Sequence, residues 1–226
     1  MYILIGGAGL VGLNLAQKLV ELGHTVAVID IDANACRYAR EQVGVMAFEG
    51  SAVSTETLIE AGIRKADSLA AVLRNDALNL ALVTLAKHYG VPHILSRMRH
   101  SDFTEPLRIA GASHIISTVE LAVSTMVNAI EYPQVESMMH FEQGQIEVLK
   151  LPIPYNCNVA GRSVADIAQD PKFPSGSLII GYQAHPHEDL IIPNGSTLLE
   201  EGSTVLIVTK PNSLHQVVDF MEECRC

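Results

Sequence analysis

The chain has 226 residues, of which 48% are hydrophobic and 18% charged. This composition provides a sizeable core and excludes a disordered chain. The formal net charge is −10; residues 1–134 carry 10 basic and 13 acidic side chains, and residues 135–226 carry 5 and 12. Nucleic acids and anionic membranes bind clustered positive charge, so we expect no nucleic-acid partner.

No apolar run reaches the roughly 18 to 20 residues that span a bilayer. The first residues begin a strand directly, without the charged and apolar segments of a signal peptide. We therefore expect a soluble protein that remains in the cytoplasm.

Short apolar runs alternate with helical patterns over the first 132 residues. Runs rich in Val, Ile, Leu and Ala are typical of parallel strands covered on both faces. The predicted strands are Tyr2–Ile5, Val26–Asp30, Val45–Phe48, Ser68–Leu73, His93–Arg97 and His114–Ser117. Helices are predicted to start near Gly9, Ala33, Thr55, Asp76, Phe103 and Val119. This alternation predicts an α/β, doubly wound parallel Rossmann domain over residues 1–134.

The pattern changes after Tyr132 and Pro133, where proline ends the preceding helix. Residues 137–151 predict two strands around Gly144. Further along, the patterns predict a helix at Ser163–Gln169, strands at Leu178–Gln183, Leu190–Ile192 and Thr204–Val208, and a helix at Asn212–Glu223. Residues 135–226 are therefore predicted to form a small, mostly antiparallel α+β domain, joined to the first by the helix Val119–Glu131.

A glycine-rich segment directly follows the first predicted strand and opens a helix. Its residues, in the pattern G-x-G-x-x-G, are Gly7, Ala8, Gly9, Leu10, Val11 and Gly12. The first glycine makes the tight turn, the second lets the backbone approach a diphosphate, and the third lets helix and strand pack closely. The helix N-terminus offers free N–H groups to the phosphates. The segment therefore predicts a dinucleotide- or nucleotide-binding loop.

Asp30 closes the second predicted strand, 18 residues after Gly12. A carboxylate at this place accepts hydrogen bonds from both ribose hydroxyls and repels a 2′-phosphate. No arginine follows immediately to hold such a phosphate. We therefore predict NAD(H), ATP, ADP or AMP as ligands and disfavour NADP.

Two later segments extend the predicted pocket. Gly50, Ser51 and Ala52 follow the third strand, where small residues let a flat base approach. Leu73 ends the fourth strand, and Arg74, Asn75 and Asp76 come next, at the sheet edge where ligands bind in such folds. Asn75 or Asp76 could instead cap the next helix, and both roles can coexist.

Arg97 closes the fifth predicted strand, with Arg99 and His100 following it. A cation here could reach a distal phosphate, including one bound by a neighbouring subunit. Surface charge without a ligand is the alternative, and the sequence leaves both open.

Cysteines and histidines give weaker signals. Cys224 and Cys226 could bind a metal or react with oxidants, but we interpret them as reduced thiols on a frayed chain end. His185 and His187 lie in a predicted hairpin turn without a convincing third metal ligand. We therefore predict no metal site.

Taken in order, these residues resemble the RCK/KTN regulators of potassium transport, of the Trk/Ktr type. The matching segments are Gly7–Gly12, 28–32, 49–52, 75–79, 97–99, 111–112 and 115–117, followed by 138–222. The resemblance adds Ile31, Asp32 and Asn79 to the predicted nucleotide site. Its order and spacing cover nearly the whole chain.

The resemblance implies a cytosolic subunit without transport activity of its own. Such subunits form homodimers and rings, commonly octamers, beneath a membrane potassium transporter or channel subunit of the TrkH or KtrB kind. Nucleotide bound near the dimer interface changes the shape of the ring and so the gate. The usual effector contrasts are ATP with ADP and NADH with NAD, and some members bind a cyclic dinucleotide in the C-terminal domain.

Two positions depart from the family pattern. Leu10 stands where Ktr-type members often have an arginine aimed at the terminal phosphate, which favours NAD(H) or the Trk type. Thr118 and Val119 replace a frequent Pro-Glu pair, with Glu120 next. The acidic second half also disfavours a cyclic dinucleotide, which is an anion.

Two other functions remain open from the sequence. An NAD-dependent oxidoreductase needs an acid–base group facing the nicotinamide, and the second half offers neither a Tyr-x-x-x-Lys element nor an evident His–Asp pair. A nucleotide sensor for another membrane carrier is the other alternative. Only the family resemblance favours potassium.

Overall fold

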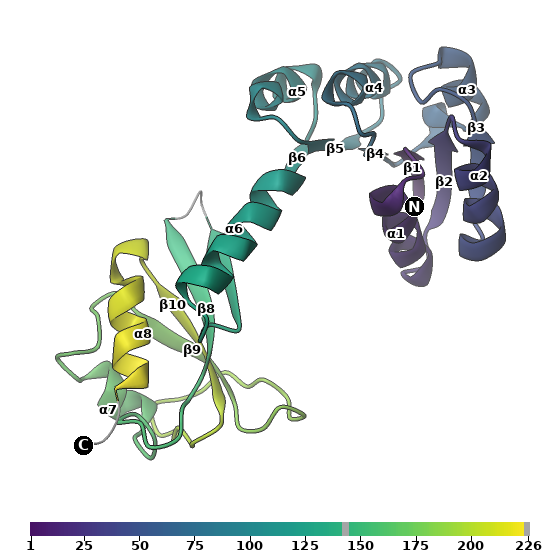
Figure 1. Ribbon diagram of the computed structural model, residues 1–226. Helices are drawn as coiled ribbons and strands as arrows, with labels where there is room; N and C mark the ends of the chain where they lie inside the picture. Colours follow the sequence, from purple (N-terminus) through teal and green to yellow (C-terminus); the bar gives the residue numbers. More distant parts are fainter. Residues whose placement is uncertain (142–144, 224–226) are drawn as a thin grey trace. The chain divides into compact units, whose positions relative to one another are not determined.

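The computed structural model describes residues 1–141 and 145–223 (Figure 1). The chain forms two compact units, Met1–Ala122 and Val123–Cys226, and each is described by itself. This division falls inside helix α6 (Thr118–Glu131), so the predicted domain boundary at residue 134 stays a prediction. Within the described ranges, no helix is both long and apolar enough to cross a bilayer.

The first unit contains a parallel sheet of six strands in the order β3-β2-β1-β4-β5-β6. The strands are β1 (Tyr2–Gly6), β2 (Thr25–Asp30), β3 (Met46–Glu49), β4 (Ser68–Ala71), β5 (His93–Met98) and β6 (His114–Ser117). The chain moves outward in both directions from β1, and the strand order reverses between β1 and β4. The predicted doubly wound Rossmann fold is confirmed, and in folds of this kind ligands bind at the carboxyl ends of the strands, where the strand order reverses.

Helices cover both faces of this sheet because its strand residues are apolar on both sides. They are α1 (Leu10–Glu21), α2 (Ala33–Tyr38), α3 (Thr55–Glu60), α4 (Asp76–His88) and α5 (Thr104–Ala110). Ile5 and Val28 pack with residues of α1 and α2, whereas Leu4, Ile29 and Leu69 pack with residues of α3, α4 and α5. Successive strand residues point to opposite faces, so the continuous apolar runs in the sequence reflect two cores.

The second unit contains an antiparallel sheet in the order β7-β8-β10-β9. Its strands are β7 (Ser137–Phe141), β8 (Ile146–Pro152), β9 (Leu178–Gln183) and β10 (Thr204–Thr209), and its helices after α6 are α7 (Val164–Ala168) and α8 (Leu214–Glu222). Ser163 begins α7 with a capping box, in which its hydroxyl and the Asp166 carboxylate satisfy each other's backbone N–H groups. The predicted small α+β architecture is confirmed.

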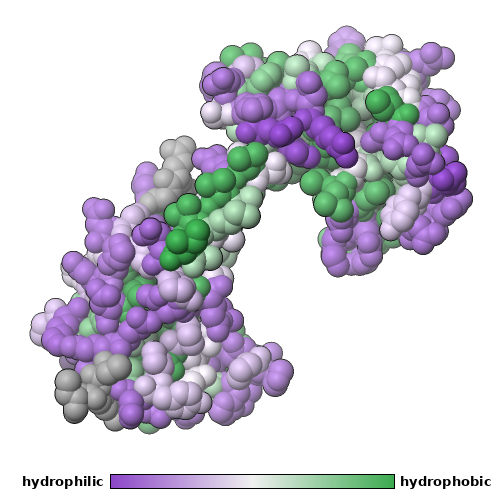
Figure 2. All heavy atoms as spheres, in the orientation of Figure 1, coloured by the Kyte–Doolittle hydropathy of each residue, from purple (hydrophilic) through white to green (hydrophobic). Residues whose placement is uncertain are grey.

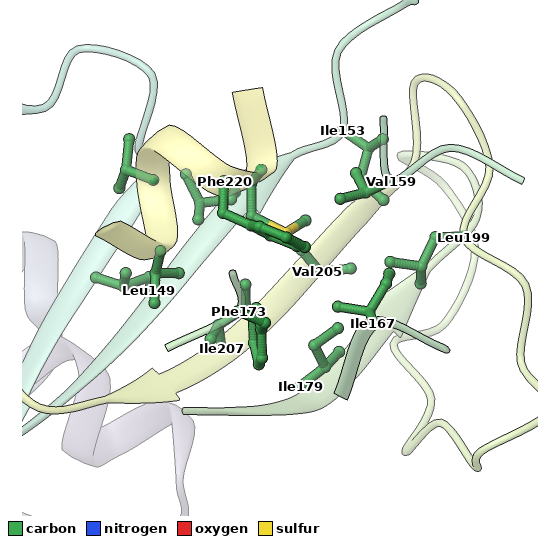
Figure 3. Packing of buried hydrophobic residues seen from close by; sticks show 14 of the residues in the cluster. Leu149, Ile153, Val159, Ile167, Phe173, Ile179, Leu199, Val205, Ile207 and Phe220 are labelled. Atoms are coloured by element: carbon green, nitrogen blue, oxygen red, sulfur yellow. The ribbon is translucent and has the colours of Figure 1, made fainter. Parts of the chain in front are cut away.

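One face of this second sheet holds the core. Leu149 on β8, Val205 and Ile207 on β10 and Ile179 on β9 are buried against residues of α7 and α8 (Figure 3). Phe173 and Phe220 meet edge to face with ring centroids 5.3 Å apart, a favoured aromatic geometry. The core therefore ties both helices to the same side of the sheet.

Three predicted elements need comment. Leu190–Ile192 is not a strand: Ile191 alone exchanges hydrogen bonds with Tyr182, both at 2.9 Å, and Pro193 follows, which lacks the N–H that pairing would need. β4 stops at Ala71 rather than Leu73, for a reason given with the site. Gly144, Cys224 and Cys226 lie outside the described residues.

Candidate nucleotide-binding site

The turn between β1 and α1 is tight and leaves the helix start open. β1 ends at Gly6, and α1 begins at Leu10. Gly7 adopts a φ of +111°, which residues with a Cβ rarely tolerate, and its N–H donates to the Ile29 carbonyl at 2.8 Å. Gly9 is the N-cap, and no described side chain caps this end. The first-turn N–H groups of α1 can therefore bind an anion.

The two later glycines of the loop have opposite surroundings. A Cβ on Gly12 would lie 1.9 Å from the carbonyl oxygen of Gly7, so glycine is needed for α1 to approach the loop this closely. This confirms the packing role predicted for Gly12. A Cβ on Gly9 would meet no protein atom within 4 Å. The backbone at Gly9 is therefore bordered by the open space that a bound diphosphate would need.

Asp30 is the last residue of β2, and two backbone groups hold its carboxylate. The N–H of Ala8 donates to one oxygen at 2.7 Å, and the N–H of Asp32 donates to the other at 2.9 Å. Each carboxylate oxygen can accept about two hydrogen bonds, so acceptor capacity remains for ribose hydroxyls. The half-buried side chain is thus fixed in orientation beside the glycine loop.

The residues around this carboxylate form an exposed rim. Leu10 is 81% exposed, Ile31 is 77% exposed, and Val11 is also exposed. The carboxylate of Asp32 accepts the N–H of Asn34 at 2.8 Å and caps α2. Asp30 and Asp32 together place two carboxylates at the end of β2, where the 2′-phosphate of NADP would meet like charge.

Small residues follow β3 beside Asp30. The N–H of Gly50 donates to the Asp30 carbonyl at 2.8 Å, so Gly50 adjoins the predicted ribose site. The Ser51 hydroxyl accepts the N–H of Val53 at 3.4 Å and supports the turn. Ala52 is buried in the core, so its predicted contact with a base stays a prediction.

Two asparagines organise the segment after β4. Asn75 caps α4, and its side-chain oxygen accepts the N–H of Leu78 at 3.1 Å; this confirms the capping alternative. Asn79 is fully buried. Its oxygen accepts the Leu73 N–H at 2.9 Å, and its amide nitrogen donates to the carbonyls of Leu73 and Arg97 at 3.0 and 3.1 Å.

Asn79 therefore explains why β4 is shorter than predicted. It takes both backbone groups of Leu73 out of the sheet's hydrogen-bond ladder and joins the ends of β4 and β5 from within the fold. Its side chain points into the core in this structure, so the predicted contact of Asn79 with a ligand stays a prediction.

Replacing Asn79 with Ala should destabilise the fold because it leaves buried backbone groups without partners. We expect the free energy of unfolding, measured in urea, to fall by about 2 to 4 kcal/mol, since each buried group left unsatisfied costs about 1 to 3 kcal/mol. The matched control Asn75→Ala removes one exposed helix cap and should cost about 1 kcal/mol. Equal losses in the two variants would contradict this role for Asn79.

Asp76 has a role that the sequence did not reveal. Its side chain is buried, and its carboxylate accepts the N–H groups of Arg99 and His100 at 3.1 and 3.0 Å. It therefore holds the segment after β5 rather than capping its own helix. In the sequence, Asp76 is an acid in the first turn of a helix, which by itself indicates a helix cap. Its contacts with residues 23 and 24 positions further along could be found only in the folded chain.

Arg97 lies at the carboxyl end of β5, next to Ile116 of β6. Its side chain is partly buried, and its Nε is fully buried with no hydrogen-bond partner among the described residues. A buried guanidinium N–H without an acceptor is costly, so the position fits a bound anion. Arg74, by contrast, is exposed.

Cys36 of α2 lies next to Asp30, the predicted ribose-binding residue. Its thiol is fully buried, 3.5 Å from the carbonyl oxygens of both Asp30 and Phe48. Burial, with smaller contributions from the charges of Asp30 and Glu49, raises the pKa of the Cys36 thiol. The thiol is therefore neutral at pH 7 and unreactive.

We predict that Cys36 resists modification until the chain unfolds. In a Cys224→Ser, Cys226→Ser background, the remaining thiols are Cys36 and Cys157, both buried. A thiol reagent at pH 8 should label them at least about 100-fold more slowly than in denaturant, because thiolate character and access both control the rate. Rapid labelling of the native protein would contradict the burial of this side chain.

The remaining polar candidates do not assemble into a second site. Among residues 1–141 and 145–223, no group of three or more His, Cys, Asp or Glu side chains could hold a metal ion. His185 and His187 lie in a turn. His215 of α8 instead shares a hydrogen bond with the hydroxyl of Tyr132, at 3.0 Å from its Nε2.

Two family models match the chain: the TrkA-N domain over residues 3–118 and the TrkA-C domain over residues 148–222. A Trk system potassium uptake protein TrkA homolog from Methanothermobacter thermautotrophicus is 30% identical over 216 residues, which cover 96% of this chain and 97% of the relative. The TrkA homolog from Pyrococcus abyssi is 29% identical over 232 residues, covering 100% and 99%.

Solved structures share the fold at lower identity. The GsuK channel bound to NAD matches 99% of this chain at 21% identity and a TM-score of 0.66, and this chain spans 40% of that channel chain. The Shewanella denitrificans Kef CTD in AMP-bound form matches 60% of this chain at 22% identity and a TM-score of 0.51. Because both family models match in order and TrkA homologs align over nearly the whole length, the chain belongs to the TrkA family.

Proposed function

We propose that this protein is a non-catalytic regulatory subunit that binds an adenine nucleotide and controls a membrane potassium transporter or channel. The observation that carries the proposal is the Asp30 carboxylate, held by the N–H groups of Ala8 and Asp32 beside the open Gly9 backbone. A carboxylate placed to accept hydrogen bonds from ribose hydroxyls, next to an uncapped helix N-terminus, is the arrangement that binds the sugar and diphosphate of such nucleotides.

The ligand in this proposal is NAD(H), ATP or ADP. The carboxylates of Asp30 and Asp32 disfavour NADP by like-charge repulsion. The first turn of α1 has no basic side chain, and exposed Leu10 occupies its first position. The two charges of a dinucleotide diphosphate need less compensation than the larger charge of ATP, which favours NAD(H). The GsuK channel, a structural neighbour, has been solved bound to NAD and also to ADP.

Arg97 supplies the cation for a more distal phosphate in this proposal. The N–H of its buried Nε has no acceptor among the described side chains and backbone. A phosphate oxygen would accept this N–H in a charge-assisted hydrogen bond. Gly50 and Ile31 lie next to Asp30 and would contact the adenosine half of the ligand.

An NAD-dependent oxidoreductase is the competing function. Asn79, Asp76 and Asn75, at the edge where a nicotinamide would lie, are all engaged in holding backbone. Hydride transfer needs a proton donor or acceptor facing the substrate, and these three residues do not supply one. If the purified protein oxidised NADH with a small carbonyl substrate, the oxidoreductase function would replace the regulatory one proposed here.

The partner in the proposal is a potassium-transporting membrane protein at the cytoplasmic face. Relatives of nearly the same length carry the name Trk system potassium uptake protein TrkA homolog, and a structural neighbour is a channel. We propose a homodimer that assembles into a ring, with eight subunits as the expected size. Copurification of this chain with a tagged membrane transporter encoded beside it tests whether the partner transports potassium or another solute.

Control would operate by a shift between populations of the dimer. A ligand that binds one dimer geometry more tightly pulls the equilibrium toward it by the difference in binding free energy, about 1 to 3 kcal/mol per site. Helix α6 leads from the first unit to the second and would carry the change between them.

Thermal unfolding with a panel of ligands tests the binding step. NAD, NADH, ATP, ADP and AMP should raise the melting temperature, more for the tighter ligands, because they bind only the folded state and the stabilisation grows with the logarithm of ligand concentration over dissociation constant. NADP should raise it least. A melting temperature that none of these ligands changes, even at millimolar concentration, would end the proposal.

A further inference from the structure

The second unit contains a cleft between the segments that flank α7 and the end of α8. Its volume is about 480 Å³, within the range of sites that hold small molecules. All of its lining residues belong to this unit, and none belongs to the candidate nucleotide-binding site. Hydrophilic side chains cover most of the visible face of this unit below α6 in Figure 2, and the cleft shares this polar character. The lining residues used below are Asn158, Arg162, Asp170, Lys172, Phe220 and Glu223.

Contacts between segments distant in the sequence hold the walls of this cleft in place. The N–H of Asn158 donates to the Glu223 carbonyl at 2.8 Å and ties the loop after β8 to the end of α8. The ring of Phe220 is buried and packs edge to face against Phe173, the residue after Lys172 (Figure 3). The cleft is therefore formed before a ligand arrives, so little binding energy is lost in ordering its walls.

Two ion pairs line the cleft, and both leave hydrogen-bond donors for a ligand. The Nη2 of Arg162 lies 2.9 Å from the Asp170 carboxylate and donates to the Asp166 carbonyl at 3.0 Å. The Nε and Nη1 of this guanidinium donate to no residue among those described. The Nζ of Lys172 lies 2.8 Å from the Glu223 carboxylate, which uses one of its three N–H donors. Because an exposed ion pair contributes little stability, a ligand can compete with this second pair.

The charged groups of the cleft keep their charges at neutral pH. The backbone N–H of Lys172, followed by the hydrogen bond from Arg162, lowers the pKa of the Asp170 carboxyl. The hydrogen bond between Lys172 and Glu223 lowers the pKa of the carboxyl and raises the pKa of the ammonium. A guanidinium is always protonated in proteins. The cleft therefore presents two cations and two anions.

These charges are not evenly distributed along the cleft. Lys172, Phe220 and Glu223 also line an adjoining hollow of about 440 Å³. The carboxylate residues Asp219 and Glu222 line that hollow as well, whereas Arg162 does not. The end of the cleft beside α8 is therefore acidic, and Arg162 supplies a cation away from that end.

We propose that this cleft binds a free α-amino acid with an apolar side chain. The ligand carboxylate accepts hydrogen bonds from the guanidinium of Arg162, the ammonium lies at the acidic end beside Glu223, and the side chain lies against Phe220. A zwitterion satisfies both charge signs of the lining. A nucleotide or another polyanion would meet the carboxylates of Asp170 and Glu223, and a polyamine would meet Arg162, so like-charge repulsion disfavours both. The site goes beyond the proposed nucleotide-dependent function and gives the second unit a ligand of its own.

Isothermal titration calorimetry on the full chain tests the class of ligand. The probes are L-leucine, L-methionine, L-valine and L-phenylalanine, and at least one of them should bind with a dissociation constant of about 1 mM or lower. For that amino acid, the N-acetyl derivative removes the positive charge and the amide removes the negative charge. Each derivative should bind at least about tenfold more weakly, because it loses a charge-assisted hydrogen bond.

A matched pair of variants tests the position of the ligand. Glu223→Gln removes the carboxylate at the acidic end, at a side chain that is 43% exposed, and should raise the dissociation constant of the amino acid at least about tenfold. Glu136→Gln is the control: its carboxylate also pairs with a lysine, Lys150 at 2.7 Å, and its side chain is 44% exposed, but it does not line the cleft. The control should change the affinity less than about twofold, because exposed ion pairs contribute little to the fold.

Four results would overturn the inference. If none of the four amino acids binds at up to about 10 mM, the cleft is not an amino-acid site. An N-acetyl derivative that binds as tightly as the amino acid makes it an anion site, and an amide that does so makes it a cation site. Equal affinities in Glu223→Gln and Glu136→Gln place the amino acid elsewhere. Titration of NAD and ATP into the same samples tests the proposed function separately, since a chain that binds the amino acid but no nucleotide would retain this site and lose that function.

Discussion

Replacing Asp30 with Ala should abolish detectable nucleotide binding. The carboxylate is the proposed acceptor for both ribose hydroxyls, and hydrogen bonds to a charged group contribute about 1.5 to 3 kcal/mol each. Losing two of them corresponds to a dissociation constant raised at least about 100-fold. The variant also releases the N–H groups of Ala8 and Asp32, which loosens the loop that faces the diphosphate. Isothermal titration calorimetry with NAD, NADH and ATP measures the effect.

Asp67 provides a matched control for this experiment. Its carboxylate also accepts a backbone N–H, from Tyr2 at 2.6 Å, but it precedes β4 and so lies at the opposite edge of the sheet. Asp67→Ala should therefore leave nucleotide affinity within about twofold, because a group this far from the ligand contributes little to binding. Equal affinities for Asp30→Ala and the wild type would show that the ribose lies elsewhere.

Replacing Gly12 with Ala should cost the most stability of any single methyl group added to this loop. The new Cβ would lie 1.9 Å from the carbonyl oxygen of Gly7 and 3.3 Å from a side-chain carbon of Val72. The first neighbour is backbone, so α1 must shift as a whole. We expect the free energy of unfolding to fall by about 3 kcal/mol, as in overpacked cores, with a lower melting temperature and loss of nucleotide binding.

Gly9→Ala separates packing from binding in the same loop. Its φ of −77° suits any residue, and its Cβ would meet no protein atom within 4 Å. Stability should therefore change by about 1 kcal/mol or less. Nucleotide affinity should still fall more than tenfold, because the methyl group occupies the space proposed for the diphosphate. A variant that binds NAD as tightly as the wild type would contradict the predicted position of the phosphates.

The sequence by itself determined the architecture of the first unit and the turn that opens its candidate site. Continuous apolar runs at the spacing of alternating strands and helices permit little besides a doubly wound sheet, because each strand must be covered on both faces. The turn at Gly7, the close packing at Gly12 and the place of Asp30 at a strand end could be predicted because they depend on local backbone geometry and on position relative to that strand end. Local features of this kind are encoded within a few residues.

The tertiary structure decided what the polar side chains contact. Asn79 and Asp76 follow an identified strand end, yet their partners, the Arg97 carbonyl and the N–H groups of Arg99 and His100, become neighbours only when β4 and β5 pair. The same holds for the segment Leu190–Ile192, whose strand-like composition could not reveal that Tyr182 would offer it a single pairing position. Hydrogen-bond partners distant in the sequence are set by the packing of whole elements, which no local pattern records.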